Sequence, residues 1–410
     1  MLVGKHSPGK DGATMRTLPD FRSRAFLKEQ IFRTLDFYYP RCVDHERGGF
    51  FNSFRDDGTI ADNRIKHLVG TTRFIYVFSV GALLGGPGWC IEMAERGLRF
   101  LRDSHADTEH GGFYNELNGL EVADDSKQGY GHAHVMLAAS VAYRAGLLSA
   151  GEWIDSTFDL LEKHAWLSEH ELYADEFHND WSHASCKRGQ NANMHLCEAM
   201  IYAYEATKER KYLDRAVTLA RRVVLHLAAQ TDGLIWETFH DDWTPDRSRE
   251  TRTRYGTYGI LTGHLTEWSK LLVMLSRYQE EDWMLPKAEY LFRTAVNRGW
   301  DSKHGGLNYS LDIDGTVLNG NKSWWVAAES IGAAAVLLQK TGDSFYAQWY
   351  LRLWEHVWMH LIDHKYGAWY ADLSPANART TDLKSPFHKT DYHPISAMYA
   401  GYQVMPQDTE

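Results

Sequence analysis

Six polar positions recur through the chain at a nearly constant interval, and their side chains are of the kinds that move protons or bind oxygen. Successive members are 59, 63, 69, 65 and 64 residues apart, and each stands near the start of a segment with helical apolar periodicity. Core histidines without a shared role have no reason to keep such a period, so we predict that the series meets in one small-molecule site. The members are Arg73, the pair Tyr130 and His132, His195, His264, Glu329 and His393.

These residue types suit proton abstraction next to a carbonyl. An imidazole gives or takes a proton near neutral pH, and an arginine stabilises a developing enediolate oxygen without losing its own charge. Glycoside hydrolysis instead needs two acidic groups across the scissile bond, and Glu329 is the one acid in the series. The pattern therefore disfavours a glycosidase.

Two of the histidines carry a glutamate three residues later, on the same face of a helix. Glu267 follows His264, and we expect its carboxylate to orient that imidazole. Glu198 follows His195 in the same way, with pairing to a nearby Lys or Arg as its alternative role. Asn191 precedes His195 by one helical turn and suits a sugar hydroxyl.

The sequence contains no local motif for a metal ion or a cofactor. His132 and His134 are two residues apart, so they point to different faces of a helix, and no HExxH pair occurs. The chain also lacks a GxxxxGK[ST] phosphate loop, a GxGxxG turn after a strand and a GxSxG elbow. We therefore expect neither metal nor cofactor, and a metal site built from sequence-distant ligands is the remaining alternative.

The elements that must position these residues also repeat. Short segments that combine aromatic residues with a glycine or a turn recur at intervals of 63, 60, 62, 72 and 62 residues. Each is typical of a short strand or an extended turn, and several follow an aspartate by a few residues. The segments are GGFFNSF (48–54), GGFYNEL (111–117), ELYADEF (171–177), GLIWETF (233–239), GGLNYSL (305–311) and GAWYADL (367–373).

Helical patterns lie between these segments, for example at 94–104, at 212–227 and at the almost wholly apolar 331–338. Six units of two helices and one extended turn predict an all-α fold, an (α/α)6 barrel of six helical hairpins with short β-like turns clustered at one end. No linker rich in Pro, Gly or Ser divides the chain. We therefore expect one catalytic domain at 15–410, preceded by a disordered or non-native extension at 1–14.

The composition is that of an ordinary globular protein, since the 410 residues carry a net charge of −10 with 44% hydrophobic and 24% charged residues. An acidic surface disfavours nucleic acid, and no apolar run approaches the roughly 18 residues that span a membrane. We expect no signal peptide, because the first residues lack an apolar core long enough for one. Four cysteines without a CxxC pair fit a reducing compartment. We therefore expect a cytoplasmic protein without nucleic-acid or membrane partners, as a monomer or a homo-oligomer.

Four longer motifs follow one another along the chain, namely RGQNANMHLCEA (188–199), GHLTEWSKLL (263–272), KSWWVAAES (322–330) and KTDYHP (389–394). With their order and spacing, the chain resembles the N-acylglucosamine 2-epimerase superfamily from residue 21 to residue 405, and the form RGQNANMH is most similar to its mannose isomerase branch. The resemblance implies metal-independent aldose–ketose isomerisation of a monosaccharide through a cis-enediol, without a cofactor. D-mannose and D-fructose are the expected pair, with D-lyxose and D-xylulose as a further one.

The resemblance also implies roles for single residues. His264 and His393 would form the acid–base pair, with His393 moving the proton between C2 and C1 and Glu267 orienting His264 for ring opening. His195 would assist ring opening or polarise the oxygen, and Arg73 would bind the enediolate oxygens. The residues that would position the sugar are Asn191, Tyr130, Trp325, Glu329 and Met194.

Two alternatives stay open. A sugar 2-epimerase of the N-acylglucosamine or cellobiose type uses the same imidazoles, because it differs only in returning the proton to the opposite face of C2. A sugar-binding barrel without catalysis is the second alternative. Disaccharide epimerases carry a tryptophan just before the last histidine, whereas this chain has Phe387 and His388 there, which favours a monosaccharide.

Overall fold

The computed structural model describes residues 18–182, 188–248 and 258–407. The extension expected at 1–14 lies outside these residues. Within the described ranges, helices and short strands alternate in an order that repeats six times. None of the described helices is long and apolar enough to cross a membrane.

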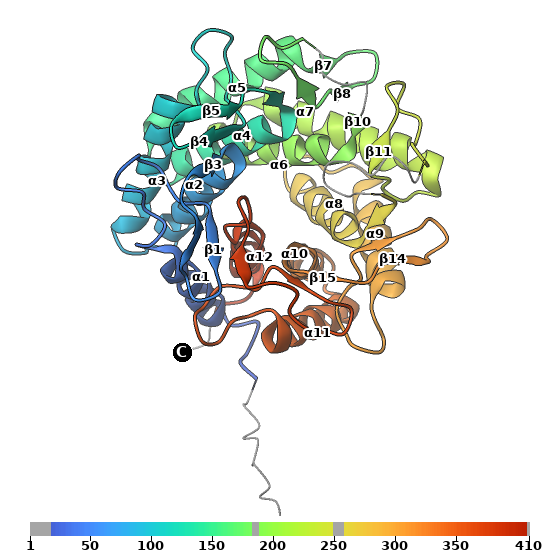
Figure 1. Ribbon diagram of the computed structural model, residues 1–410. Coiled ribbons are helices and arrows are strands. Elements are labelled where there is room, and N and C mark those ends of the chain that lie inside the picture. Colours follow the sequence, from blue (N-terminus) through green and yellow to red (C-terminus); the bar gives the residue numbers. More distant parts are fainter. Residues whose placement is uncertain (1–17, 183–187, 249–257, 408–410) are drawn as a thin grey trace, which may run out of the picture.

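Six inner helices form a closed ring around a central axis (Figure 1). Each contacts the next one along the chain, and the last contacts the first. They are buried around most of their circumference, which explains apolar runs such as the unbroken buried stretch from Trp324 to Leu337. The inner helices are Leu68–Leu83 (α2), Gly129–Arg144 (α4), Gln190–Thr207 (α6), Thr262–Leu275 (α8), Trp324–Thr341 (α10) and Tyr392–Val404 (α12).

Six outer helices cover this ring, each with an apolar face turned toward it. They are Arg24–Tyr38 (α1), Trp89–Phe100 (α3), Gly151–His164 (α5), Arg210–Arg221 (α7), Met284–Gly299 (α9) and Ser344–His360 (α11). Five pack on the inner helix that precedes them, and α1 packs on α12, so the first and last helices form the sixth hairpin. Beyond α3 and α7 the helical patterns continue as π-helical turns at Leu101–His105 and Arg222–Leu227. The predicted (α/α)6 barrel is confirmed.

Short strands gather at the end of the ring where the inner helices begin. A strand leads toward each inner helix and pairs, antiparallel, with a strand at the end of the next repeat segment, and the last such pair returns to the first segment. These pairs are β3 (Ile65–His67) with β4 (Glu116–Asn118), β6 (Lys127–Gln128) with β9 (Glu176–Phe177), β10 (Arg188–Gly189) with β11 (Thr238–Phe239), β12 (Ile260–Leu261) with β13 (Ser310–Leu311), β15 (Lys322–Ser323) with β16 (Asp372–Leu373), and β17 (Leu383–Ser385) with β1 (Ser53–Arg55). Three further strands extend these pairs, β2 (Ile60–Asp62), β5 (Glu121–Asp124) and β14 (Val317–Asn319), and β7 (Trp166–Leu167) pairs with β8 (Leu172–Tyr173).

In four of the six units, a largely buried lysine–aspartate pair joins the turn after the outer helix to the strand that leads to the next inner helix. Asp107 caps the turn that follows it, because its Oδ1 accepts from the backbone N–H groups of Glu109 and His110. Its Oδ2 lies 2.7 Å from Nζ of Lys127, in the strand that leads to α4. The aspartates noted before the repeat segments are thus turn caps with a fixed counter-ion. The same pair recurs as Asp44 with Lys66, Asp301 with Lys322 and Asp363 with Lys384.

Candidate active site

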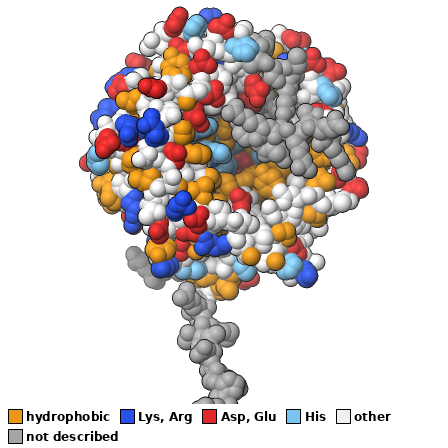
Figure 2. Space-filling view, in the orientation of Figure 1, with side chains coloured by type: hydrophobic (Ala, Val, Ile, Leu, Met, Phe, Trp, Pro, Cys, Tyr) orange, Lys and Arg blue, Asp and Glu red, His pale blue; other side chains and the backbone are white. Residues whose placement is uncertain are grey.

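A cavity of about 520 Å³ opens on the axis of the barrel, at the end where the inner helices begin. It is seen as a recess in the face of the molecule in Figure 2. Each of the six inner helices contributes at least one side chain to its wall. The structure brings seven of the predicted site residues to this cavity, namely Arg73, Tyr130, Asn191, His195, His264, Trp325 and His393.

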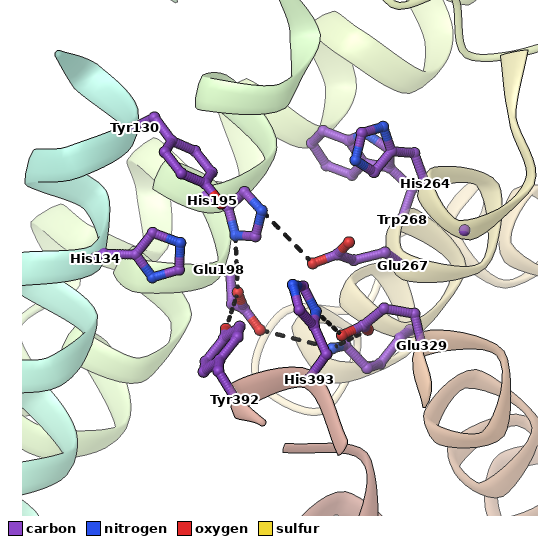
Figure 3. A network of polar contacts seen from close by, with 12 residues as sticks. Tyr130, His134, His195, Glu198, His264, Glu267, Trp268, Glu329, Tyr392 and His393 are labelled. Carbon is purple, nitrogen blue, oxygen red and sulfur yellow. Dashed lines mark hydrogen bonds and ion pairs between the residues drawn. The ribbon is translucent and has the colours of Figure 1, made fainter. Parts of the chain in front are cut away.

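His393 is held as a neutral imidazole at the start of α12. Its Nδ1 lies 2.7 Å from Oε1 of Glu329 (Figure 3), and its Nε2 lies 3.2 Å from Nη2 of Arg73. Because a carboxylate accepts and a guanidinium only donates, these partners assign the hydrogen to Nδ1 and the lone pair to Nε2. Burial lowers the pKa of His393 well below its usual value, and the charge of Arg73 lowers it further. His393 is therefore an unprotonated base at neutral pH.

Arg73 is fixed on the wall of the cavity by several acceptors. Its Nη1 donates to the backbone carbonyl of His388 over 2.5 Å, and its Nη2 donates to the hydroxyl of Tyr130 over 2.9 Å. The same Nη2 is 3.4 Å from Nε2 of His134, and the guanidinium lies 4.8 Å from the ring centre of Tyr392. An arginine held in this way is pre-organised to bind negative charge in the cavity.

His264 has a different carboxylate partner from the one expected. Its Nδ1 lies 2.8 Å from Oε1 of Glu237, the residue just before β11, and no contact between His264 and Glu267 is found among the described residues. The backbone N–H of Glu237 donates to the carbonyl of Gly259, just before β12, which brings Glu237 beside the start of α8, whereas Glu267 lies one turn deeper. Gln190 donates to the second oxygen of Glu237 and accepts from Trp268, which fixes the carboxylate in place.

His195 lies between two glutamates (Figure 3). Its Nδ1 is 3.3 Å from Oε2 of Glu198, which also accepts from the hydroxyl of Tyr392, and its Nε2 is 3.9 Å from Oε1 of Glu267. Neither oxygen of Glu267 has a hydrogen-bond partner within the described part of the chain. Burial raises the pKa of Glu267 well above its usual value, as does the nearby charge of Glu329. This environment therefore favours the protonated, neutral form of Glu267.

Two overlapping groups of side chains have the ligand types and spacing that a cation needs. His195 with Glu198 and Glu267 forms one, and Glu267 with Glu329 and His393 forms the other, each with its ligand atoms within 4.8 Å of one another. A cation of the chain itself lies among these carboxylates. The ammonium of Lys270 already contacts the carboxylates of Glu198 and Glu329, and it supplies positive charge at this place.

Not every residue singled out from the sequence lines the cavity. Glu267 and Glu329 lie behind its wall, against His195 and His393. His132 faces away from it, because its Nε2 accepts from the backbone N–H of Phe113 and its Nδ1 bonds a carbonyl one turn earlier. Met194 was expected to bind the sugar, and it is instead completely buried in the core. Adjacent helical residues are turned by about 100°, so Met194 points away from the direction of His195.

The repeat segments contribute functional positions that sequence reasoning missed. Their last residues stand beside the start of an inner helix, and in three consecutive segments the fifth residue lines the cavity. Superposing the six segments on one another would have marked these positions, because they keep the same register. The fifth residues on the cavity wall are Asp175, Glu237 and Tyr309, and the sixth are Glu176, Thr238 and Asp372.

A closed ring of six helical hairpins, around a cavity that joins imidazoles to carboxylates and an arginine, defines an (α/α)6-barrel enzyme built for proton transfer. The comparison with protein families makes this class specific. The chain belongs to the N-acylglucosamine 2-epimerase (GlcNAc 2-epimerase) family, whose model matches residues 49–397.

Relatives of known activity are similar over nearly the whole chain. The D-mannose isomerase of Marinomonas mediterranea is 44% identical over 385 residues, which is 93% of this chain and 97% of the relative. A crystal structure of a D-mannose isomerase has a TM-score of 0.92 at 43% identity, over 94% of this chain and 100% of that chain. The cellobiose 2-epimerase of Bacteroides fragilis is 25% identical, over 89% of this chain and 95% of the relative.

Proposed function

We propose that this protein is an aldose–ketose isomerase that interconverts D-mannose and D-fructose through a cis-enediol, with D-lyxose and D-xylulose as a further pair. The observation that carries this proposal is the contact between His393 and Arg73 inside the cavity. The lone pair of Nε2 and the guanidinium are 3.2 Å apart, so a base and a cation for the enediolate oxygens meet at one point. The 44% identity to a D-mannose isomerase favours isomerisation over 2-epimerisation.

In the proposed reaction, Nε2 of His393 takes the proton from C2 of the open-chain aldose. The C–H electrons form the C1=C2 bond, and the π electrons of the C1 carbonyl move onto its oxygen. Arg73 then shifts its hydrogen bonds to the oxygens on C1 and C2, where the negative charge develops. The carboxylate of Glu329 holds Nδ1–H of His393 and stabilises the imidazolium. When the proton returns to C1, C2 becomes the carbonyl carbon of the ketose.

The two other imidazoles serve the oxygens of the sugar. His264 has its Nδ1 on Glu237, which leaves Nε2 for proton exchange with the ring oxygen during ring opening. His195, also on the cavity wall, exchanges protons with the hydroxyl groups on C1 and C2. The neutral acid of Glu267 lies next to His195 and offers a proton there.

The rest of the wall positions one sugar unit. The Oδ1 atom of Asn191 is buried without a partner among the described residues, and an acceptor in that state suits a sugar hydroxyl. The ring of Trp325 lies 4.9 Å from that of His264 and 6.0 Å from that of His393, and forms an apolar surface between them. Tyr130 sits on the other side of Arg73. A monosaccharide is the proposed partner.

We also propose that residues 15–410 act as one catalytic domain in the cytoplasm. The uninterrupted ring of hairpins supports the single domain. Among the described residues, Cys42, Cys90 and Cys197 are buried free thiols, which fits a reducing compartment.

The activity is tested by incubating EDTA-treated protein with D-mannose in D2O and following the sugars by NMR. Formation of D-fructose is the expected result, and persistence of the activity in EDTA supports chemistry without a dissociable metal. D-glucose with deuterium at C2 would instead assign the protein to the 2-epimerases. Failure to convert D-mannose and D-lyxose alike would contradict the proposed function.

A further inference from the structure

A lysine with no part in the proposed proton transfers lies directly beneath the cavity. Lys270, on α8, is 1% exposed and does not line the cavity wall. Its Nζ donates to Oε2 of Glu329 over 2.5 Å and lies 3.6 Å from Oε1 of Glu198. A buried ammonium needs such partners, but two carboxylates from two other helices are more than a simple ion pair requires.

Those two carboxylates are the partners of two imidazoles on the cavity wall. Glu329 accepts from Nδ1 of His393, and Glu198 lies 3.3 Å from Nδ1 of His195, as Figure 3 shows for the labelled residues. A single ammonium thus connects two histidine–carboxylate pairs that belong to three different helices, α6, α10 and α12. The charge of Lys270 acts on both imidazoles through the oxygens that orient them.

The charge of Lys270 affects which of the surrounding carboxyl groups are ionised. Three carboxyl groups lie close together in a place that water does not reach, and like charges there resist joint ionisation. Burial raises the pKa of Glu329, and the ammonium of Lys270 opposes that rise. Lys270 likewise lowers the pKa of Glu198. The charged and titratable groups that face this cluster are Glu198, His195 and Tyr202 from α6, Glu267 from α8 itself, Glu329 from α10, Tyr392 and His393 from α12, Arg73 and Tyr76 from α2, and Tyr130 and His134 from α4.

We propose that Lys270 is a positioning residue that keeps Glu198 and Glu329 ionised together and thereby keeps the lone pair of His393 on Nε2, toward the substrate. The inference rests on the proposed isomerase function. Without the ammonium, one of the two carboxylates takes up a proton. A protonated Glu329 donates to Nδ1 of His393, which moves the imidazole hydrogen to Nε2 and removes the base from the cavity.

The test compares Lys270→Met with the wild type in D-mannose isomerisation across pH. At neutral pH the variant should lose at least about tenfold in kcat, because a fraction of Glu329 is protonated, while KM changes by less than about threefold. The acidic limb of kcat should move up by about one pH unit or more, so that the loss shrinks as the pH rises. An acidic limb at the wild-type pH would overturn the inference.

Lys127→Met is the matched control. Lys127 is as deeply buried, and it also pairs with an acidic residue, but that residue, Asp107, contacts neither His195 nor His393. Its variant should lose stability without any shift of the acidic limb. An equal shift in Lys127→Met would show that loosening the barrel suffices, and it would also overturn the inference.

Two further measurements keep the test decisive. If Lys270→Met does not fold, Lys270→Arg keeps the charge, and its acidic limb should stay at the wild-type pH. A shifted limb would contradict the proposal.

Nitrogen NMR of labelled histidine reads the tautomer of His393 without any sugar, and Lys270→Met should convert Nε2 from a lone-pair nitrogen to an N–H nitrogen. This signal reports on Lys270 even if the wild type isomerises neither sugar, so failure of the function and failure of the inference remain distinct.

Discussion

At the scale of single residues, the protonation of buried groups decides which atoms can move a proton. The base of His393 works only while Nε2 is unprotonated, and its activity is lost as the pH falls through the pKa of the folded protein. Burial and Arg73 lower that pKa well below the usual value. We therefore expect kcat/KM for D-mannose to stay nearly constant from pH 8 down to about 6, below the ordinary histidine pKa. Initial rates measured across this pH range check the prediction. A fall in kcat/KM centred near pH 7 would contradict it.

The second prediction at this scale concerns the proton on Glu267. Since burial favours the neutral form of this side chain, the amide of Glu267→Gln should replace it with a loss of less than about tenfold in kcat. Glu329→Gln removes a carboxylate that His393 needs, and we expect a loss of about a hundredfold or more. Steady-state kinetics of the two variants compare them directly. Equal losses would show that Glu267 works as an ion.

At the scale of elements, the strand pairs position both the turns and the carboxylates of the site. Lys66, in β3, lies 2.8 Å from Oδ2 of Asp44, and both side chains are buried. Lys66→Met leaves a buried charge without its partner, so we expect a loss of about 3–5 kcal/mol in the free energy of unfolding. Urea unfolding measures it, with Lys163→Met on the exposed face of α5 as the control. A loss below about 1 kcal/mol would show that the pair is not needed.

The strand pairs also explain which site residues could be predicted. Residues such as Arg73, His195 and His393 repeat in phase on apolar helices, and this periodicity alone indicates that they share one end of the barrel. Glu237 was missed because it belongs to a repeat segment 27 residues before His264, and spacing within one helix cannot indicate such a contact. The i, i+3 rule placed Glu267 on the correct helix, but it says nothing about a competing acid from another element.

At the scale of the whole molecule, the barrel depends on the pairing of its first and last helices. Leu27 of α1 is completely buried, and its Cδ1 lies within 3.3 Å of the place where a Cβ on Gly401 of α12 would stand. Leu27→Ala should cost about 2–5 kcal/mol in the free energy of unfolding, although the residue is remote from the cavity. Glu29→Ala, on the exposed side of α1, is the control. Equal stabilities of the two variants would contradict the role of this closing contact.

The sequence indicated closure of the ring only through the number of its repeats. Six repeats are compatible with an open solenoid as well as with a barrel, because periodicity describes each unit and not the contact between the first and the last. That contact is made by α1 with α12 and by β17 with β1, between segments more than 300 residues apart. Closure of the ring brings His393 beside Arg73. The site is complete only in the closed ring, because each unit supplies only some of its residues.

The measurement that tests the account most directly is the exchange of the C1 hydrogen of D-fructose with D2O, followed by NMR for His393→Asn and His264→Asn. If His393 is the base at carbon, its variant should lose the exchange by at least about a thousandfold. His264→Asn should still exchange the open-chain fraction, because His264 serves ring opening. Exchange by His393→Asn within about tenfold of the wild type would contradict the central claim that this imidazole carries the proton between C2 and C1.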